Sequence, residues 1–452
     1  MNDVQHLRSA LAGRAFGPHD DGYESLRRPW NLSIDQQPAL VVMAESTADV
    51  QAAVRVAAGA GLPLAVQSSG HGAVHPCDGG IVVNVSRMTD LQVDPGAQLA
   101  RLGAGQRWRS VLEATDPYGL IGLSGTAHGV GVVGYTLGGG LGITMRTFGF
   151  AADSLLGADL VTADGELVRA DDAQNPDLFW ALKGGGGNFG VVTSVDLRLY
   201  PVPQVVNGMM AYPGARAAEV VSAWAQWTQH VPDDVTSIVM LVTIPSVPEV
   251  PEPMRGQHLV MVLATVVGAD TAALDQLRSQ LGAPLIDTFA PSGYLRAAMS
   301  GMEPEDPSTS AGRSALLTSL SEPTIAQLTA AGGPNSPISA LEIRHLGGAA
   351  ARAPRDSSAI PHRDAPYLVA MHAAPADEAQ AATTVDLMDE ALAGIADDTR
   401  VGMFLNFLHH GSTTDEVRAA YDPATYTRLT EVKRDYDPGN LFRYNHNIPP
   451  AT

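Results

Sequence analysis

Short apolar runs separated by turn residues fill the first 200 residues of the chain. The runs that we interpret as strands are residues 40–44, 63–69, 81–85, 91–102, 158–162, 166–169 and 191–199. Asp94-Pro95-Gly96 divides one run by a turn, and Ala163-Asp164-Gly165 predicts a hairpin. Helical patterns cover 47–61, which Ser46 precedes as N-cap, and also 107–114 and 176–182.

The pattern changes at the PVPQVV segment, which begins at Pro201. Strands and helices then follow in the manner of an α+β protein. The expected strands are 238–243, 259–267, 338–346, 367–372 and 401–408, and the expected helices are 215–230, 271–281 and 379–395. The Pro-rich segment 245–255 and segment 301–313 are predicted surface loops.

The composition is that of a folded protein with an acidic surface. The chain has 452 residues, 45% hydrophobic and 17% charged, which is enough for about two or three domains with cores of their own. The net charge is −20, and only Lys183 and Lys433 are lysines among 28 basic residues. A nucleic-acid interface requires a basic patch, and an anionic membrane would repel this chain, so we expect neither partner.

Cysteine use and hydropathy favour a cytoplasmic protein. Cys77 is the single cysteine, so the chain cannot form an intramolecular disulfide. The first 26 residues lack the apolar core of a secretory signal. No apolar run reaches the roughly 18 residues that a membrane-spanning helix requires.

Two glycine-rich segments, at 122–142 and 183–190, are the strongest chemical signal. Glycine lets the main chain approach a ligand closely, and main-chain amides can bind an anion without cationic side chains. The two segments therefore indicate a large phosphate-bearing cofactor. GVGVVG at 129–134 has the spacing of a dinucleotide fingerprint, but no βαβ unit surrounds it, which argues against a nicotinamide-type domain.

Six segments occur in a specific order along the chain. They are QSSGHG at 67–72, CDGGIVVNVSRM at 77–88, the first glycine segment, ADSLLGADLVTADGEL at 152–167, DLFWALKGGGGNFGVVTSVDLRLYP at 177–201 and YDPGNLFRYNHNIPP at 436–450. This set resembles the berberine-bridge-enzyme-like oxidases of the vanillyl-alcohol-oxidase superfamily. The resemblance implies an α+β fold with a two-subdomain PCMH-type FAD-binding domain and an antiparallel substrate sheet backed by helices. Residues 1–200 and 410–452 would form the FAD domain and 201–409 the substrate domain.

The resemblance also assigns cofactor roles. His71 matches the histidine that bonds to the flavin 8-methyl group, and Ala127 replaces the cysteine that forms a second bond in many relatives, so it implies FAD attached through His71 only. Val130 matches the position that controls oxygen access, which favours an oxidase. The positions assigned to FAD binding are Ser68, Ser69, Gly70, His71, Gly72, Gly125, Thr126, His128, Val130, Gly131, Gly134, Gly138, Gly139, Gly142, Gly190, Val192, Asn445 and Asn447. His128 is equally well explained as a polar filler of the space that the cysteine left.

The proton acceptor is less well defined. Relatives carry Y-x-N-Y where this chain has Phe404-Leu405-Asn406-Phe407, and phenylalanine cannot accept a proton. On the predicted strand SALEIRHLGG, alternation sends Glu342 and Arg344 to one face and His345 to the other. These three residues are the catalytic candidates. Glu342 would be a base whose pKa burial raises, and the alternative is a salt bridge to Arg344 or Arg363.

The sequence thus predicts an FAD-dependent oxidase acting on a small, apolar or aromatic specialised metabolite, an alcohol or a related C–H bond. Hydride would pass to flavin N5, and O2 would reoxidise the flavin to give hydrogen peroxide. The alternatives are a carbohydrate or hydroxy-acid oxidase or dehydrogenase and, from another class, a non-catalytic flavin-binding protein. The scattered histidines show no metal-ligand spacing, so we expect no metal.

Overall fold

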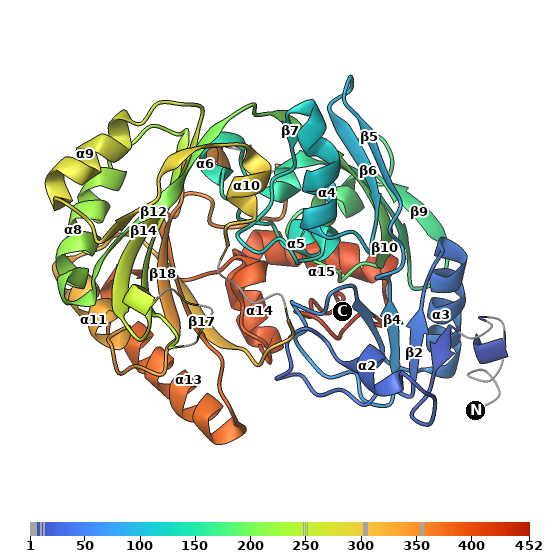
Figure 1. Cartoon of the computed structure of the whole chain (residues 1–452). Coiled ribbons are helices and arrows are strands. Elements are labelled where there is room, and N and C mark those ends of the chain that lie inside the picture. Colours follow the sequence, from blue (N-terminus) through green and yellow to red (C-terminus); the bar gives the residue numbers. More distant parts are fainter. Residues whose placement is uncertain are drawn as a thin grey trace.

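The computed structural model describes residues 7–9, 11, 14–246, 248, 250, 252–301, 306–352 and 357–452. They form two lobes, each built on β-sheet (Figure 1). Strands β1 to β11 belong to one lobe, and a single large sheet forms the other. The C-terminal helices α14 (Thr414–Ala420) and α15 (Pro423–Tyr436) lie beside the first lobe.

A mixed sheet with the order β1-β2-β4-β3 opens the first lobe. Its strands are β1 (Ala15–Phe16), β2 (Leu40–Met43), β3 (Leu64–Gln67) and β4 (Ile81–Asn84). Helix α3 (Thr47–Ala60) connects β2 to β3, and the predicted cap is confirmed. Ser46 Oγ accepts a hydrogen bond from the Asp49 amide, and the Asp49 carboxylate accepts one from the Ser46 amide.

An antiparallel sheet with the order β5-β6-β10-β8-β9 completes this lobe. Its strands are β5 (Leu91–Asp94), β6 (Leu99–Gly103), β8 (Leu155–Val161), β9 (Leu167–Ala170) and β10 (Val191–Arg198). A separate pair joins β7 (Leu120–Ile121) to β11 (Tyr200–Pro201). The helices of this lobe are α2 (Tyr23–Arg27), α4 (Trp108–Thr115), α5 (Val132–Leu137), α6 (Met145–Phe148) and α7 (Pro176–Leu182).

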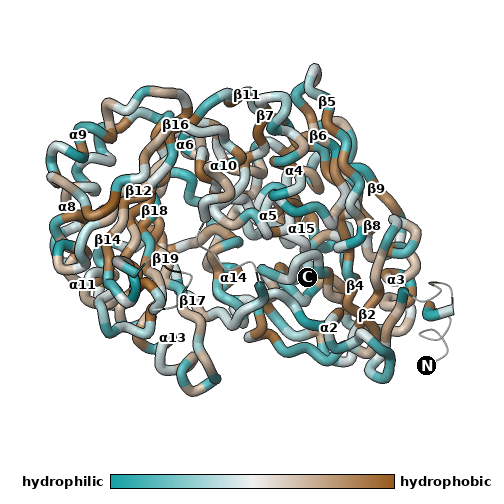
Figure 2. The backbone as a smooth tube through the Cα atoms, viewed as in Figure 1, coloured by the Kyte–Doolittle hydropathy of each residue, from teal (hydrophilic) through white to brown (hydrophobic). Residues whose placement is uncertain are grey.

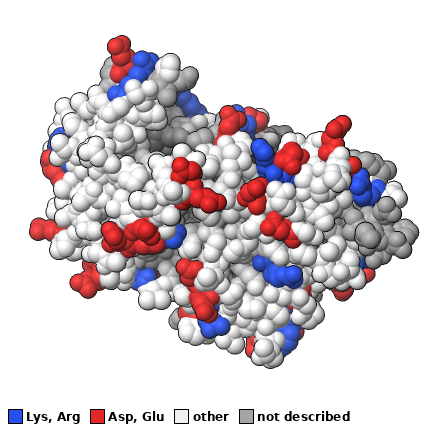
Figure 3. Space-filling view, turned by 90° about the horizontal axis from the view of Figure 1, so that it is seen from below, with Lys and Arg blue, Asp and Glu red and all other residues white. Residues whose placement is uncertain are grey.

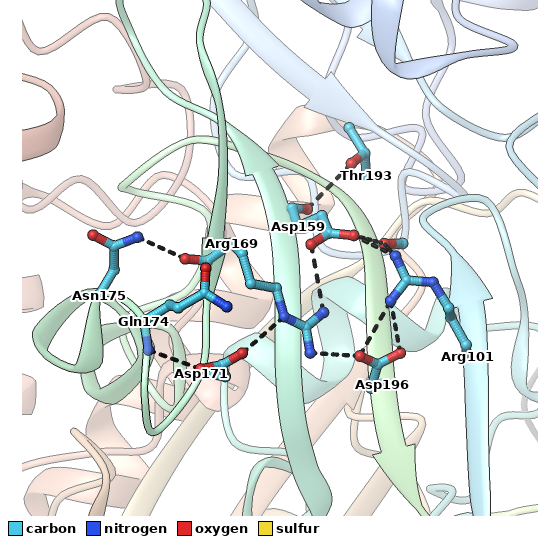
Figure 4. A network of polar contacts seen from close by, with 9 residues as sticks. Arg101, Asp159, Arg169, Asp171, Gln174, Asn175, Thr193 and Asp196 are labelled. Carbon is cyan, nitrogen blue, oxygen red and sulfur yellow. Dashed lines mark hydrogen bonds and ion pairs between the residues drawn. The ribbon is translucent and has the colours of Figure 1, made fainter.

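Charged side chains link four strands of the antiparallel sheet (Figure 4). Arg101 on β6 pairs with Asp159 on β8 and Asp196 on β10. Arg169 on β9 pairs with the same two carboxylates and with Asp171. Opposite charges therefore face each other across neighbouring strands, which favours the observed register.

The second lobe is a nine-stranded sheet. The order is β15-β12-β14-β13-β18-β19-β17-β20, and β16 pairs with β12. Its strands are β12 (Val205–Pro213), β13 (Val235–Thr243), β14 (His258–Val267), β15 (Ile286–Asp287), β16 (Ala290–Ser292), β17 (Ala311–Leu317), β18 (Ala340–His345), β19 (Tyr367–Ala373) and β20 (Thr399–Arg400). Its helices are α8 (Ala217–Thr228), α9 (Ala272–Leu281), α10 (Tyr294–Ala298), α11 (Glu322–Ala331), α12 (Ala349–Arg352) and α13 (Glu378–Ala393).

Two large cores underlie the lobes. One lies between the nine-stranded sheet and its helices and includes Trp224 of α8 and Met388 of α13. The other joins the strands of the first lobe to the C-terminal segment through residues such as Phe442 and Ile448. Apolar residues follow the central strands in Figure 2. The antiparallel substrate-type sheet backed by helices is confirmed.

Several predicted elements need correction. Residues 401–408 are not a strand, because Gly402 has φ +117° and residues 405–407 form a 3₁₀ turn. Part of segment 301–313, a predicted loop, belongs to β17, and residues 302–305 lie outside the described residues. Residues 247, 249 and 251 of the predicted loop 245–255 also lie outside them. Strand β12 and helix α11 had no predicted counterpart.

The surface agrees with the acidic composition. On the face shown in Figure 3, acidic and basic side chains are interspersed, and no continuous basic patch is visible. Among the described residues, no helix combines the length and the apolar character needed to cross a bilayer. These residues also contain no group of histidine, cysteine and carboxylate side chains arranged to hold a metal ion.

Candidate functional site

The loop after β3 carries Ser68, Ser69, Gly70, His71 and Gly72, and an N-terminal segment holds it from one side. The amide of Trp30 donates to Ser69 O over 3.2 Å, and the amide of Asn31 donates to Gly70 O over 3.4 Å. Gly70 has φ +74°, and a Cβ there would lie 2.5 Å from the Cα of Pro29. Only glycine therefore fits at position 70.

This loop meets the first glycine segment at the start of α5. A Cβ on Gly131 would lie 3.3 Å from Ser68 Oγ, so the main chain at Gly131 packs closely against the Ser68 side chain. In contrast, a Cβ on Gly72, Gly129 or Gly134 would meet no protein atom within 4 Å. The histidine loop (68–72) and the glycine segment thus meet beside open space, and we call this arrangement the cradle because a ligand could be held there.

Other glycines of the predicted FAD set make room for protein atoms. A Cβ on Gly125 would lie 3.1 Å from the ring of Tyr135, and one on Gly138 would lie 1.8 Å from Asn406 Oδ1. Gly142 and Gly190 face main-chain oxygens, those of Ser124 and Val161, at 2.8 and 2.7 Å. Gly139 has φ +113°, and Val192 is buried in the core of the first lobe. Packing inside the protein therefore accounts for the small residue at these glycine positions, and their contact with FAD stays a prediction.

The C-terminal segment presents two amide side chains. Asn445 Nδ2 donates to Phe442 O over 3.2 Å, and the neighbouring main chain is fixed by Asn188, which bonds His446 O and the Ile448 amide. The Oδ1 atoms of Asn445 and Asn447 are buried without a hydrogen-bond partner in the described protein, as are Ser68 Oγ and Tyr135 Oη. Unsatisfied buried polar atoms are costly and are expected where a polar ligand binds.

The start of α4 holds the middle of the glycine segment. The Trp108 amide donates to Val130 O over 3.1 Å, and the Arg109 amide donates to His128 O over 2.9 Å. The Arg109 guanidinium also lies 3.5 Å from His128 Nε2. Val130 is half-buried, as is Thr126. These contacts fix the main chain beside the open space.

Glu342 and Arg344 form an ion pair on the face of β18 that faces away from the helices. Arg344 Nε donates to Glu342 Oε1 over 2.9 Å, and Arg344 Nη2 donates to Oε2 over 3.1 Å. Burial is the largest influence on Glu342 and alone would raise its pKa, but the charges and hydrogen bonds of Arg344 and His372 together outweigh it, and the pKa falls to about 2. The expectation of a raised pKa is wrong, and the alternative of a salt bridge to Arg344 is correct. Arg363 pairs with Asp153 instead.

His345 points to the opposite face, as alternation predicted. Its ring packs edge-on against Trp224, with ring centroids 6.4 Å apart, and its Nε2 lies 3.1 Å from Arg146 Nη1. Burial and the charge of Arg146 lower the pKa of His345 to about 3. The structure therefore does not bring His345 together with Glu342 and Arg344.

Residues 404–407 connect the glycine segment to the sheet. Asn406 Nδ2 donates to Tyr135 O over 2.8 Å, and the ring of Phe407 lies 5.3 Å from Arg344 Cζ. The sequence did not identify Asn406, Tyr135 or Trp30 as site residues. Gly138 was a usable signal, because the missing side chain there leaves the space that Asn406 occupies. The candidate site lies where these segments meet.

Gly70→Ala and Gly72→Ala should separate folding from cofactor binding. In His71→Ala protein freed of flavin, Gly70→Ala should lower the free energy of unfolding by about 1–3 kcal/mol, because φ is positive and Pro29 blocks the Cβ. Gly72→Ala should change it by less than about 0.5 kcal/mol but reduce FAD binding. Urea unfolding and FAD titration measure both effects, and a Gly72→Ala variant with undiminished FAD affinity would contradict the cradle.

Comparison with known proteins identifies the family. Residues 38–171 match the family described as FAD binding domain, and residues 404–449 match the family described as Berberine and berberine like. The chain is 31% identical to (R)-6-hydroxynicotine oxidase of Paenarthrobacter nicotinovorans over 459 residues, which covers 98% of this chain and 97% of that protein. It is 26% identical to xylooligosaccharide oxidase of Thermothelomyces thermophilus, over 94% of this chain and 89% of that protein.

Comparison with solved structures supports the same family assignment. The crystal structure of 6-hydroxy-D-nicotine oxidase from Arthrobacter nicotinovorans has a TM-score of 0.85 and 28% identity, covering 97% of this chain and 98% of that one. Physcomitrella patens BBE-like 1 shares the fold with a TM-score of 0.86 at 21% identity, over 99% of both chains. With relatives named as oxidases, the alternative of a non-catalytic flavin-binding protein is set aside. The chain belongs to the berberine-bridge-enzyme-like family and is an FAD-dependent oxidase with a PCMH-type FAD-binding fold.

Proposed function

We propose that this enzyme oxidises a small, largely apolar or aromatic molecule at an alcohol carbon or a related C–H bond, with FAD attached through His71 alone. Residues 1–200 and 410–452 hold the cofactor, and residues 201–409 hold the substrate. Bound FAD would supply a hydride acceptor at N5, and O2 would take up the electron pair together with two protons as hydrogen peroxide. The observation that carries the proposal is the cradle, in which Gly72, Gly129 and Gly134 border open space and the Ser68 Oγ atom at the contact with Gly131 has no hydrogen-bond partner in the described protein.

A single attachment point is supported by the surroundings of the two reactive side chains. His71 is half-buried on the loop that borders the cradle. Cys77 is fully buried in a small apolar cluster, and burial raises the pKa of its thiol to about 12. A thiol in that state is a poor nucleophile, and Ala127 offers none.

The sheet face that carries Glu342 supports an apolar substrate. Met240 lies directly opposite Glu342 on β13, Ile238 lies opposite Arg344, and Leu263 of β14 lies opposite Ile238. Residues directly opposite each other in an antiparallel pair share a face. The β13 and β14 side of the ion pair is therefore apolar, whereas a sugar site needs several hydrogen-bonding groups and stacking aromatic rings.

The polar residues on this face have separate proposed roles. A carboxylate with a pKa of about 2 is a weak base at neutral pH, so Glu342 acts by holding Arg344 in place. Arg344, stacked near Phe407, orients the polar group of the substrate. His372 Nε2 lies 3.4 Å from Glu342 Oε1 on the same face, and we propose His372 as the acceptor of the substrate proton.

Two experiments test the proposal. The yellow colour of the wild-type protein should remain with the precipitate after acid treatment, and His71→Ala should release it as free FAD. Loss of colour from the wild-type precipitate would contradict the attachment. Anaerobic mixing should bleach the flavin with aromatic alcohols or related apolar compounds and not with xylobiose, and the reverse order would support carbohydrate oxidation.

A further inference from the structure

The indole of Trp30 lies against the imidazole of His71. The two ring centroids are 4.4 Å apart and the planes are inclined by 43°. Both residues are half-buried, although they are separated by forty residues of chain that include a helix and two strands. Aromatic pairs at this spacing have a preferred geometry, so the indole restricts the orientation of the imidazole.

The N-terminal segment 29–32 holds the indole in place. On one side, its main chain pairs with the histidine loop, residues 68–72. The Trp30 amide donates a hydrogen bond to Ser69 O, and the Asn31 amide donates one to Gly70 O. On the other side, the Ser308 amide donates to Trp30 O over 3.0 Å and the Leu32 amide donates to Ser308 O over 2.9 Å. Segment 29–32 is therefore fixed between the histidine loop and the segment that leads into β17.

The loop itself is shaped to receive this segment. The positive φ of Gly70 turns the main chain so that Pro29 packs where a side chain would stand. Next to this loop, Gln36 Nε2 donates to Gln67 Oε1 over 3.0 Å, and Gln67 Nε2 donates to Arg28 O over 3.3 Å. Contacts at the start and in the middle of the loop thus keep the indole beside His71.

We propose that Trp30 is a positioning residue for covalent attachment of FAD, because it holds the His71 imidazole in the orientation from which a ring nitrogen reaches the flavin 8α carbon. This inference rests on the proposed attachment through His71. In the reaction a C–N bond forms, while one C–H bond of the 8-methyl group and the imidazole N–H bond break. The methyl carbon is oxidised by two electrons, and O2 takes up the electron pair and both protons as hydrogen peroxide.

The test adds FAD to protein produced without riboflavin and follows covalent flavin over time on denaturing gels. Trp30→Ala should slow attachment on the order of 10- to 100-fold, as expected for a reacting group displaced by about an ångström. The dissociation constant for reversible FAD binding, measured by flavin fluorescence, should stay within about twofold of the wild-type value. Trp30→Phe retains an aromatic face and should restore most of the rate. Leu32→Ala, an exposed position on the same segment, is the matched control and should attach FAD at the wild-type rate.

The outcomes are distinguishable. Attachment at the wild-type rate in Trp30→Ala would overturn the positioning role and leave the His71 attachment intact. Equal losses of attachment and of reversible binding in both Trp30 variants would also overturn it, because they would indicate a purely structural role. A wild-type protein that never attaches FAD would overturn the attachment and the positioning role together.

Discussion

Replacing Lys433 by methionine should lower the free energy of unfolding by about 3–5 kcal/mol, the usual cost of removing one partner from a buried ion pair. The Lys433 side chain is fully buried on α15. Its Nζ donates to Asp437 Oδ2 at 2.5 Å, to Asn188 O at 2.7 Å and to Phe442 O at 3.2 Å. Methionine would leave the Asp437 carboxylate and two carbonyl oxygens without this donor in the core.

Urea unfolding of flavin-free protein measures this effect. Arg434→Met is the matched control, since Arg434 is the next residue on α15 and its side chain is half-exposed beside Asp435. That change should cost less than about 1 kcal/mol. FAD affinity should also fall in Lys433→Met, because Asn188 fixes the segment that carries Asn445 and Asn447. Equal stability of the two variants would show that the buried pair is not what ties the C-terminal segment to the first lobe.

Arg344→Met should produce the second large effect, a loss of about 10²–10³ in the rate constant for flavin reduction by any compound that bleaches the wild type. The Arg344 guanidinium is the nearest positive group to Glu342, and without it the buried Glu342 carboxylate keeps only its 3.4 Å contact with the half-exposed His372. The pKa of Glu342 should then rise, because burial is no longer opposed by Arg344.

The pH dependence of the free energy of unfolding distinguishes the intact Glu342–Arg344 ion pair from a Glu342 carboxylate that has lost Arg344. In the wild type the pKa of Glu342 is depressed from 4.5 to about 2, so the pair contributes stability above pH 4.5 that is lost as pH falls toward 2. In Arg344→Met the sign reverses, and acidification below neutral pH should stabilise the variant. Arg344→Met with Glu342→Gln should recover most of the lost stability at pH 7. If the stability of the Arg344→Met variant had the same pH dependence as that of the wild type, the coupling between Arg344 and Glu342 would be contradicted.

Local signals determined which elements could be predicted. Helix α3 follows from its capping box and apolar periodicity, and both depend on residues within one or two turns. Residues 401–408 have a strand-like composition, but Gly402 turns the chain and a 3₁₀ turn directs Asn406 toward Tyr135. That outcome depends on a contact with a residue more than two hundred positions away, which local patterns do not encode.

The site shows the same division. The histidine loop and the glycine segment are continuous motifs and were recognised from the sequence. The direction of the Glu342 pKa shift could not be predicted from the sequence. Alternation places Arg344 on the same face as Glu342 but does not show whether the guanidinium pairs with Glu342 or with another carboxylate. Trp30 was not identified because its partner His71 is brought close only by pairing between main-chain segments.

Mass spectrometry of the purified protein tests the central claim most directly. The account predicts that the intact chain carries the added mass of one FAD and that fragmentation places it on His71, with Cys77 unmodified. An intact mass equal to the polypeptide alone, in a colourless protein that does not take up added FAD, would contradict it.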